Sequence, residues 1–270
     1  MGKVKVLFIT QEMKPYTALS EISEIARKLP QYVQGKGMEI RVLMPRFGTI
    51  NERRHRLHEV VRLSGMNIIV DDDDFPLIIK VASLPGARMQ VYFLDNEDFF
   101  KRKSVFENPE GKAFDDNADR MVFFCKGVIE TVKKFGWPPD VVHCHGWMTS
   151  LVPMYLKTAY QNEPLFRNSK VVYSMYEQEY EKHFDETFLE KASINNLTQE
   201  DLMPFVSNGD IRLHLGAASF SDALVVGSEN LVSDVTESVE KLEKPLLKHP
   251  DLNQDDYAAE YLAFYNSILE

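Results

Sequence analysis

The feature that most constrains the fold is an alternation of short apolar runs with longer segments of helical periodicity. Apolar residues recur at helical spacing over Ala18–Val33 and Asn117–Phe135, and Thr149–Thr158 also has the character of a helix. Between such segments lie short runs that are typical of buried strands: Val4–Thr10, Glu39–Met44, Val141–His143, Val171–Met175 and Asp222–Val226. The alternation predicts an α/β fold with a doubly wound parallel sheet, in which these strands are neighbours and helices cover both faces.

The remaining segments predict smaller features around this sheet. Phe75–Ser83 and Met89–Leu94 have the pattern of further strands, and Val60–Val70 that of an edge strand. The carboxylates of Asp71–Asp74 lie between strand-like runs and lack the alternate spacing and the later glutamate of a calcium loop. They therefore predict a solvated hairpin turn. Phe184–Gly209 is polar and predicts a helical or loop excursion at the ligand end of the sheet.

Composition and charge argue against several classes of function. The net charge is −10, which is unfavourable for a nucleic-acid or an anionic membrane surface as partner. Two cysteines make no disulfide framework, and no apolar stretch is long enough to span a bilayer, so we expect a cytoplasmic protein. The chain has neither a G-x-G-x-x-G motif nor a P-loop, and we expect no cofactor.

The segment His143–Trp147 follows an apolar strand and leads toward a helix. Open α/β sheets present polar side chains at a ligand crevice in this way. Alternation along the strand places His143 and His145 on one face and Cys144 on the other, toward the core. Because no second cluster of ligands accompanies them, the pattern favours neither a metal site nor thiol chemistry at Cys144.

Several segments, all in the same order, resemble the N-terminal domain of bacterial glycogen and starch synthases, which are retaining transferases that use a nucleotide-sugar donor. The segment Gly136–Lys157 is similar to the family's Pro-Asp-Val-Val-His-x-His-Asp-Trp motif. The other similar segments are Val4–Glu12, Met38–Ile50, Gln90–Lys101, Asp116–Phe124 and Asp222–Ser228. Together they cover about residues 3–230, and the resemblance implies one half of a GT-B glycosyltransferase.

The resemblance also implies a sugar-binding crevice near the carboxyl ends of the strands. His145 is the sugar-contacting position that the chain retains, beside His143 and Trp147 of the same motif. Asn117 and Arg120 begin the helix that borders the crevice. We expect these side chains to gather in one cavity that binds substrate, and we assign no catalytic residue.

Departures from the family affect mainly its donor side. The family's Lys-Thr-Gly-Gly-Leu loop, whose lysine and glycines approach the donor phosphates, is replaced by Ala18, Leu19, Ser20, Glu21 and Ile22. The cation is gone and a carboxylate stands where backbone should approach an anion, which is the wrong charge for phosphate binding. Three further replacements are Gly146 for the aspartate of the motif, Ser174–Glu177 for Thr-Ile-His-Asn, and His214–Leu215 for a lysine-glycine pair.

The resemblance divides the chain into three parts. Residues 1–230 correspond to the N-terminal Rossmann-like domain, residues 231–254 to a shortened connection, and residues 255–270 to the family's final helix. In this interpretation the donor-binding domain is absent, and the last helix packs back on the first domain or forms a dimer contact. Asp255 or Asp256 would be its N-cap, and its apolar stripe consists of Tyr257, Tyr261, Phe264, Tyr265 and Ile268.

These expectations favour a glycogen or starch synthase-like domain that is inactive alone, a pseudoenzyme that binds α-glucan or regulates a partner enzyme. Transfer requires groups that stabilise the departing phosphate charge, and the loop has lost them. Two alternatives stay open. One is a half-transferase that a partner glycosyltransferase chain completes, so that glucose passes from ADP-glucose to an α-1,4-glucan. The other is a structural interaction domain without a sugar ligand.

Overall fold

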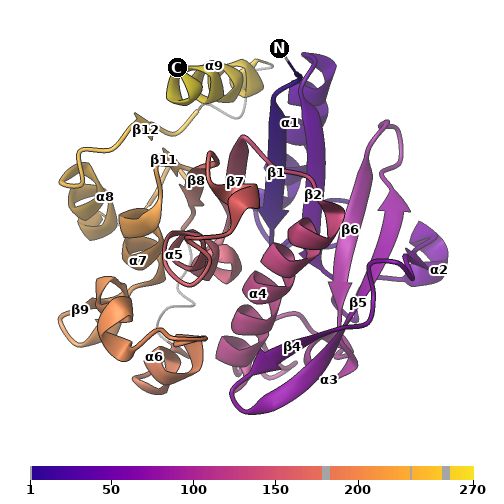
Figure 1. The fold of residues 1–270 in the computed structure, drawn as a ribbon, viewed down its shortest axis with the longest axis horizontal. Helices are drawn as coiled ribbons and strands as arrows, with labels where there is room; N and C mark the ends of the chain where they lie inside the picture. The colour runs from indigo at the N-terminus through magenta and orange to yellow at the C-terminus, as the bar shows by residue number, and fades with distance from the viewer. Residues whose placement is uncertain (1, 178–182, 232, 251–255) are drawn as a thin grey trace.

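The computed structural model describes residues 2–177, 183–231, 233–250 and 256–270. Within these ranges ten strands form one mixed sheet in the order β12-β11-β8-β7-β1-β2-β6-β5-β3, with β4 paired to β5 (Figure 1). The strands are β1 (Lys5–Thr10), β2 (Glu39–Pro45), β3 (His58–Glu59), β4 (Met66–Val70), β5 (Asp73–Ser83), β6 (Gln90–Asp95), β7 (Val141–His145), β8 (Lys170–Met175), β11 (Ala223–Val226) and β12 (Leu246–Leu247). A separate hairpin pairs β9 (Val206–Ser207) with β10 (Asp210–Ile211).

The predicted strands are parallel neighbours at the centre of this sheet, in the order β11-β8-β7-β1-β2. On β1, Val6 lies opposite Ile40 of β2 and Val141 of β7. Residues 6–10 are all buried, because helices cover both faces of a parallel sheet. This burial explains why the strand is continuously apolar, and the predicted α/β fold with its parallel central sheet is confirmed.

One edge of the sheet is antiparallel, whereas the five strands predicted as parallel neighbours lie at its centre. β5 runs antiparallel to β3, β4 and β6. A short turn with Pro85 and Gly86 joins β5 to β6, and so short a link permits only an antiparallel pair. The hairpin turn predicted at Asp71–Asp74 is confirmed but is shorter: Asp71, with a φ of 55°, and Asp72 form the turn, and Asp73, which pairs with Val70, begins β5.

The described helices follow the sequence pattern closely in the middle of the chain and less closely elsewhere. The long helix predicted for Asn117–Phe135 has those bounds, whereas the first helix begins at Ile22 because residues 18–21 form a loop. The predicted helix Thr149–Thr158 is split into a 3₁₀ turn over Trp147–Thr149 and a shorter α-helix. The helices are α1 (Ile22–Gly35), α2 (Glu52–His55), α3 (Glu97–Phe100), α4 (Asn117–Phe135), α5 (Leu151–Lys157), α6 (Thr187–Ala192), α7 (Leu213–Phe220), α8 (Ser233–Glu240) and α9 (Tyr257–Leu269).

The two sides of the sheet carry different helices. α4 and α5 lie in front of the sheet in Figure 1, and Cys144 of β7 faces them, close to Cys125 of α4. His143, one position earlier on β7, points to the other side, where its ring contacts Tyr265 of α9. α9 also packs against α1. The two faces of β7 therefore meet separate layers of the molecule.

The C-terminal part of the chain adds to the sheet. Residues 231–254, predicted as a connection, contain α8 and β12, and β12 extends the sheet by pairing with β11 in parallel.

In α9, Tyr257, Tyr261 and Tyr265 are buried within the chain. Asp256 makes no capping bond with its side chain, which instead accepts a hydrogen bond from Tyr32 Oη at 3.2 Å, and Asp255 lies outside the described residues. The division of the chain at residues 230 and 254 stays a prediction.

The polar segment Phe184–Gly209 is an excursion of helices and turns, as expected. It contains α6, a 3₁₀ helix over Gln199–Phe205, and β9. Leu202 and Phe205 of the 3₁₀ helix are buried against α7, so this excursion belongs to the packed core. Residues 178–182, which precede it, lie outside the described ranges.

Candidate functional site

His143 and His145 project from β7 to the same face of the sheet, as predicted, with ring centroids 3.9 Å apart. His143 Nδ1 lies 2.5 Å from Tyr265 Oη, and its Nε2 lies 2.7 Å from Ser174 Oγ on β8. His145 Nδ1 lies 2.8 Å from Tyr176 Oη. In the described chain the Nε2 atom of His145 has no hydrogen-bond partner. Neighbouring hydroxyl groups therefore use three of the four ring nitrogens.

Tyrosines of α9 cover His143, and Tyr176 and Phe8 contact His145. Tyr261 and Tyr265 are 0% exposed, and so are His143 and His145. Burial lowers the pKa of His143 well below its usual range, with repulsion from His145 as the smaller cause. Burial also lowers the pKa of His145 to about 3. The two imidazoles are therefore neutral at physiological pH and lie in a packed interior that the chain's own tyrosines fill.

Asn117 and Arg120 form a second, separate group at the start of α4. Arg120 donates from Nε to the carbonyl of Phe99 at 2.8 Å, and from a terminal nitrogen to Asn117 Oδ1 at 2.7 Å. Asn117 donates to the carbonyl of Phe106 at 2.8 Å. These bonds hold the segment between α3 and α4 against the helix. The guanidinium also lies 5.4–5.7 Å from the ring centroids of Phe47, Phe100 and Phe114.

Trp147 belongs to this second group. Its ring centroid is 4.8 Å from that of Phe106, and the side chain is fully buried. The structure thus places the predicted site residues in two buried groups: His143 with His145 beneath α9, and Asn117, Arg120 and Trp147 around the start of α4. Their predicted role in binding sugar stays a prediction.

Gly146, which replaces an aspartate of the resembling motif, is explained by its surroundings. Its φ is 86°, a left-handed conformation that favours glycine. A Cβ atom at this position would overlap the side chain of Gln11. Gln11 Oε1 accepts a hydrogen bond from the backbone N–H of Met148 at 3.2 Å. Gln11 therefore occupies the space that a side chain at position 146 would need.

The loop that replaces the family's donor loop is bound to a buried carboxylate. Glu12 accepts hydrogen bonds from the backbone N–H groups of Leu19 at 2.5 Å and Ser20 at 3.0 Å, and from Ser20 Oγ at 2.6 Å. Burial raises the pKa of Glu12, and these hydrogen bonds oppose that rise. The backbone N–H groups of Leu19 and Ser20 are therefore already hydrogen-bonded within the protein.

Glu21 links this loop to the end of β11. Its carboxylate accepts a hydrogen bond from the hydroxyl of Ser228, and that hydroxyl accepts one from the backbone N–H of Glu177 at 2.8 Å. Ala18 and Leu19 are exposed beside it, and Ile22 is buried as the first residue of α1. The Glu21 carboxylate therefore lies near the end of β11, at the place where the resemblance implies a phosphate group.

Other positions that depart from the family take part in the same interior. Besides Ser174 and Tyr176, His214 of α7 lies with Nδ1 2.9 Å from Tyr173 Oη and with Nε2 2.9 Å from the carbonyl of Tyr176. The sequence analysis identified Ser174, Tyr176 and His214 as departures from the family, and it identified the tyrosines of the last helix as an apolar stripe. It could not predict that Ser174, Tyr176 and Tyr265 contact His143 and His145, because these residues are far apart in the chain.

The described residues offer little for other chemistry. They contain no group of three or more His, Cys, Asp or Glu side chains that could hold a metal ion. Cys125 and Cys144 are buried, and burial raises the pKa of both thiols, so each stays protonated. None of the helices in the described ranges has the length and apolar character that a membrane crossing requires.

Comparison with known proteins agrees with the resemblance. A glycogen synthase from Pelodictyon phaeoclathratiforme is 39% identical over 173 residues, which cover 64% of this chain and 35% of that protein. A glycogen synthase from Chlorobaculum tepidum is 38% identical over 191 residues, which cover 67% of this chain and 39% of that protein. The chain thus spans 35–39% of the length of these curated relatives.

The fold is shared with a solved plant enzyme. The catalytic domain of starch synthase IV from Arabidopsis thaliana, in a structure bound to ADP and acarbose, matches with a TM-score of 0.76 at 17% identity. The match covers 92% of this chain and 51% of that one. The sequence profile of the starch synthase catalytic domain matches residues 5–248. This chain therefore belongs to the starch synthase catalytic domain family and is a glycogen or starch synthase-like glycosyltransferase domain.

Proposed function

We propose that this chain is a non-catalytic member of its family, which by itself transfers no glucose and acts in α-glucan metabolism by binding or regulation. The observation that carries the proposal is the carboxylate-bound loop over residues 18–22. The amides of Leu19 and Ser20 already donate to Glu12, and Glu21 adds a second carboxylate at the same edge of the sheet. A loop with this charge repels a departing phosphate instead of stabilising it.

The state of the two histidines supports the same proposal. His143 and His145 are 0% exposed, and Tyr265 bonds directly to His143. A substrate could reach His143 from the side of α9 only if that helix moved and left Tyr261 and Tyr265 exposed to water. Full burial of each such side chain is worth roughly 1.5–3 kcal/mol, so this displacement is costly.

The test is transfer of radiolabelled glucose from ADP-glucose to glycogen by the purified chain, with the glycogen synthase of Chlorobaculum tepidum as the positive control. We expect incorporation at the background level, because loss of one group that stabilises developing charge already costs about 10²–10³ in rate. Robust incorporation by the purified chain would falsify the proposal. Incorporation that arises only after a second chain is added would instead support a half-transferase.

A further inference from the structure

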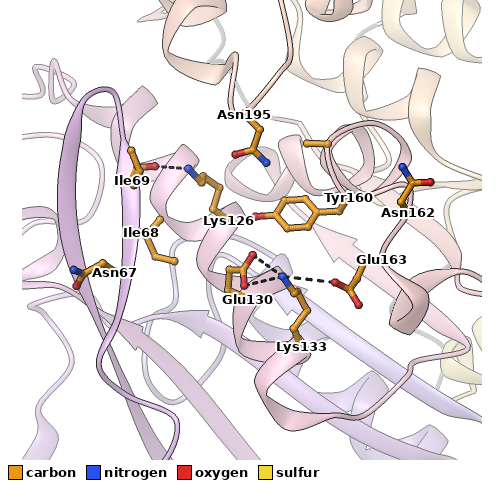
Figure 2. Close-up of a pocket in the computed structure, with 11 residues that line it drawn as sticks. Asn67, Ile68, Ile69, Lys126, Glu130, Lys133, Tyr160, Asn162, Glu163 and Asn195 are labelled. Carbon is orange, nitrogen blue, oxygen red and sulfur yellow. Dashed lines mark hydrogen bonds and ion pairs between the residues drawn. The ribbon is translucent and has the colours of Figure 1, made fainter.

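A pocket on the α4 side of the sheet has the composition of a ligand site and takes no part in the interactions described above. Its volume is about 510 Å³, within the usual range of roughly 300–1,000 Å³ for small-molecule sites. Four separate parts of the chain form it (Figure 2). They are β4 with Asn67, Ile68 and Ile69, α4 with Lys126, Glu130 and Lys133, the turn after α5 with Ala159, Tyr160, Asn162 and Glu163, and the turn after α6 with Asn195.

The charged groups of this pocket, which we call the α4 pocket, cancel one another. Lys133 Nζ lies 3.0 Å from a Glu130 carboxylate oxygen and 3.6 Å from one of Glu163. Lys126 Nζ donates to the carbonyl of Ile69 at 2.5 Å and lies on the same face of α4 as Glu130. Two lysines and two glutamates give a formal charge of zero. The pocket therefore has no excess charge that would select a phosphate or a metal cation.

The fixed ion pairs still offer hydrogen bonds. An ammonium group has three donors and a carboxylate has several acceptor sites, so each retains capacity for a ligand beyond its partner. Burial raises the pKa of the Tyr160 hydroxyl, and the charge of Glu130 and a hydrogen bond to that carboxylate raise it further. Such a mixture of donors and acceptors in one small space matches hydroxyl groups, which both donate and accept.

Uncharged groups complete the α4 pocket. In Figure 2 the side chain of Asn195 points toward Tyr160 and Lys126. Asn195 is exposed, and within the described chain its amide makes no hydrogen bond, so both its donor and its acceptor are available. At the opposite wall, β4 contributes the backbone carbonyl of Ile69, which accepts the hydrogen bond from Lys126, and the buried side chain of Ile68. The ring of Tyr160 adds further apolar surface.

We propose that the α4 pocket binds a neutral carbohydrate, with its hydroxyl groups on Asn195, Glu163 and Lys133 and its apolar face against the ring of Tyr160. A sugar is the common ligand that combines many uncharged hydroxyl groups with an apolar C–H face, and these groups are what the pocket presents. The inference rests on the binding role in the proposed function and deepens it by naming a place where a carbohydrate binds. Its test needs no nucleotide-sugar donor, so the pocket can fail to bind sugar while the chain still transfers no glucose. The inference also concerns the face of the sheet opposite to His143 and His145.

The experiment is isothermal titration of the full chain with maltohexaose and with cellohexaose. Asn195→Ala and Glu163→Gln should each weaken binding of the sugar by about three- to tenfold, the effect of one hydrogen bond to a ligand. Asn208→Ala is the matched control. Asn195 and Asn208 are both exposed, with φ values of 55° and 54°, so the two alanines have the same backbone cost. Asn208→Ala should leave binding unchanged.

Three results would overturn the inference. The first is no binding of either oligosaccharide up to about 10 mM, a concentration far above the Kd of typical specific ligands. The second is binding that neither Asn195→Ala nor Glu163→Gln weakens. The third is binding that falls more than about tenfold between about 50 and 500 mM salt, since only a charged ligand is screened in this way. Selective binding of either oligosaccharide with the expected response to both variants supports the assignment and identifies the preferred linkage.

Discussion

At the scale of single residues, Gly146 and Gln11 are best understood as a pair. Gly146→Asp, which restores the residue of the resembling motif, should destabilise the fold by about 1–3 kcal/mol, because aspartate at a φ of 86° is strained and overlaps Gln11. In a Gln11→Ser background the same change should cost less, since the space that Gln11 fills is then free. Urea denaturation of the four proteins in this double-mutant cycle measures the coupling, and strictly additive effects would contradict it.

At the scale of elements, α9 stabilises the fold through two buried tyrosines that differ in one respect. The hydroxyl of Tyr265 bonds to His143 at 2.5 Å, whereas that of Tyr261 has no partner in the described chain. Tyr265→Phe should therefore lower the free energy of unfolding by about 1–3 kcal/mol, because it leaves a buried ring nitrogen unsatisfied. Tyr261→Phe, one turn earlier, removes an unsatisfied group and should be neutral or stabilising. Thermal melts of both variants test this difference, and equal losses would refute it.

At the scale of the whole molecule, a single buried core runs from Val6 to Tyr265, so protonation of its buried histidines affects the entire fold. The folded pKa values of His143 and His145 lie below the unfolded value, so the unfolded state binds more protons as the pH falls below about 6.5. The contribution of the two histidines to the free energy of unfolding should be fully present above that pH. It should fall by about 1 kcal/mol per histidine for each pH unit toward pH 5. Glu12, whose pKa is raised, acts in the opposite direction at lower pH.

The measurement is the urea midpoint at pH 7, 6 and 5, converted to free energy with the slope at each pH. His145→Asn should reduce the pH dependence of the free energy of unfolding, because one of the two titrating imidazoles is removed. His58→Asn, at an exposed position on β3, is the control and should leave the dependence unchanged. An equal pH dependence in all three proteins would contradict the assignment to the buried histidines.

The sequence by itself determined the features that depend on local pattern. Hydrophobic periodicity predicted the central strands and α4, since strands and helices bury side chains at different fixed spacings. The ordered motifs identified the family, and alternation along β7 placed His143 and His145 on one face and Cys144 on the other. Comparison with the family's Lys-Thr-Gly-Gly-Leu loop marked residues 18–22 as a departure, because a cation is lost and a carboxylate is gained.

Only the tertiary structure decided which distant segments meet. It brought the hydroxyl of Tyr265 to His143, bonded Arg120 to Asn117 and to the carbonyl of Phe99, added β12 to the sheet and assembled the α4 pocket from four parts of the chain. These contacts join residues as far apart as His143 and Tyr265, and no short-range pattern encodes them. Packing fixes such contacts, because a buried face is covered by whichever distant element fits its shape and satisfies its polar groups.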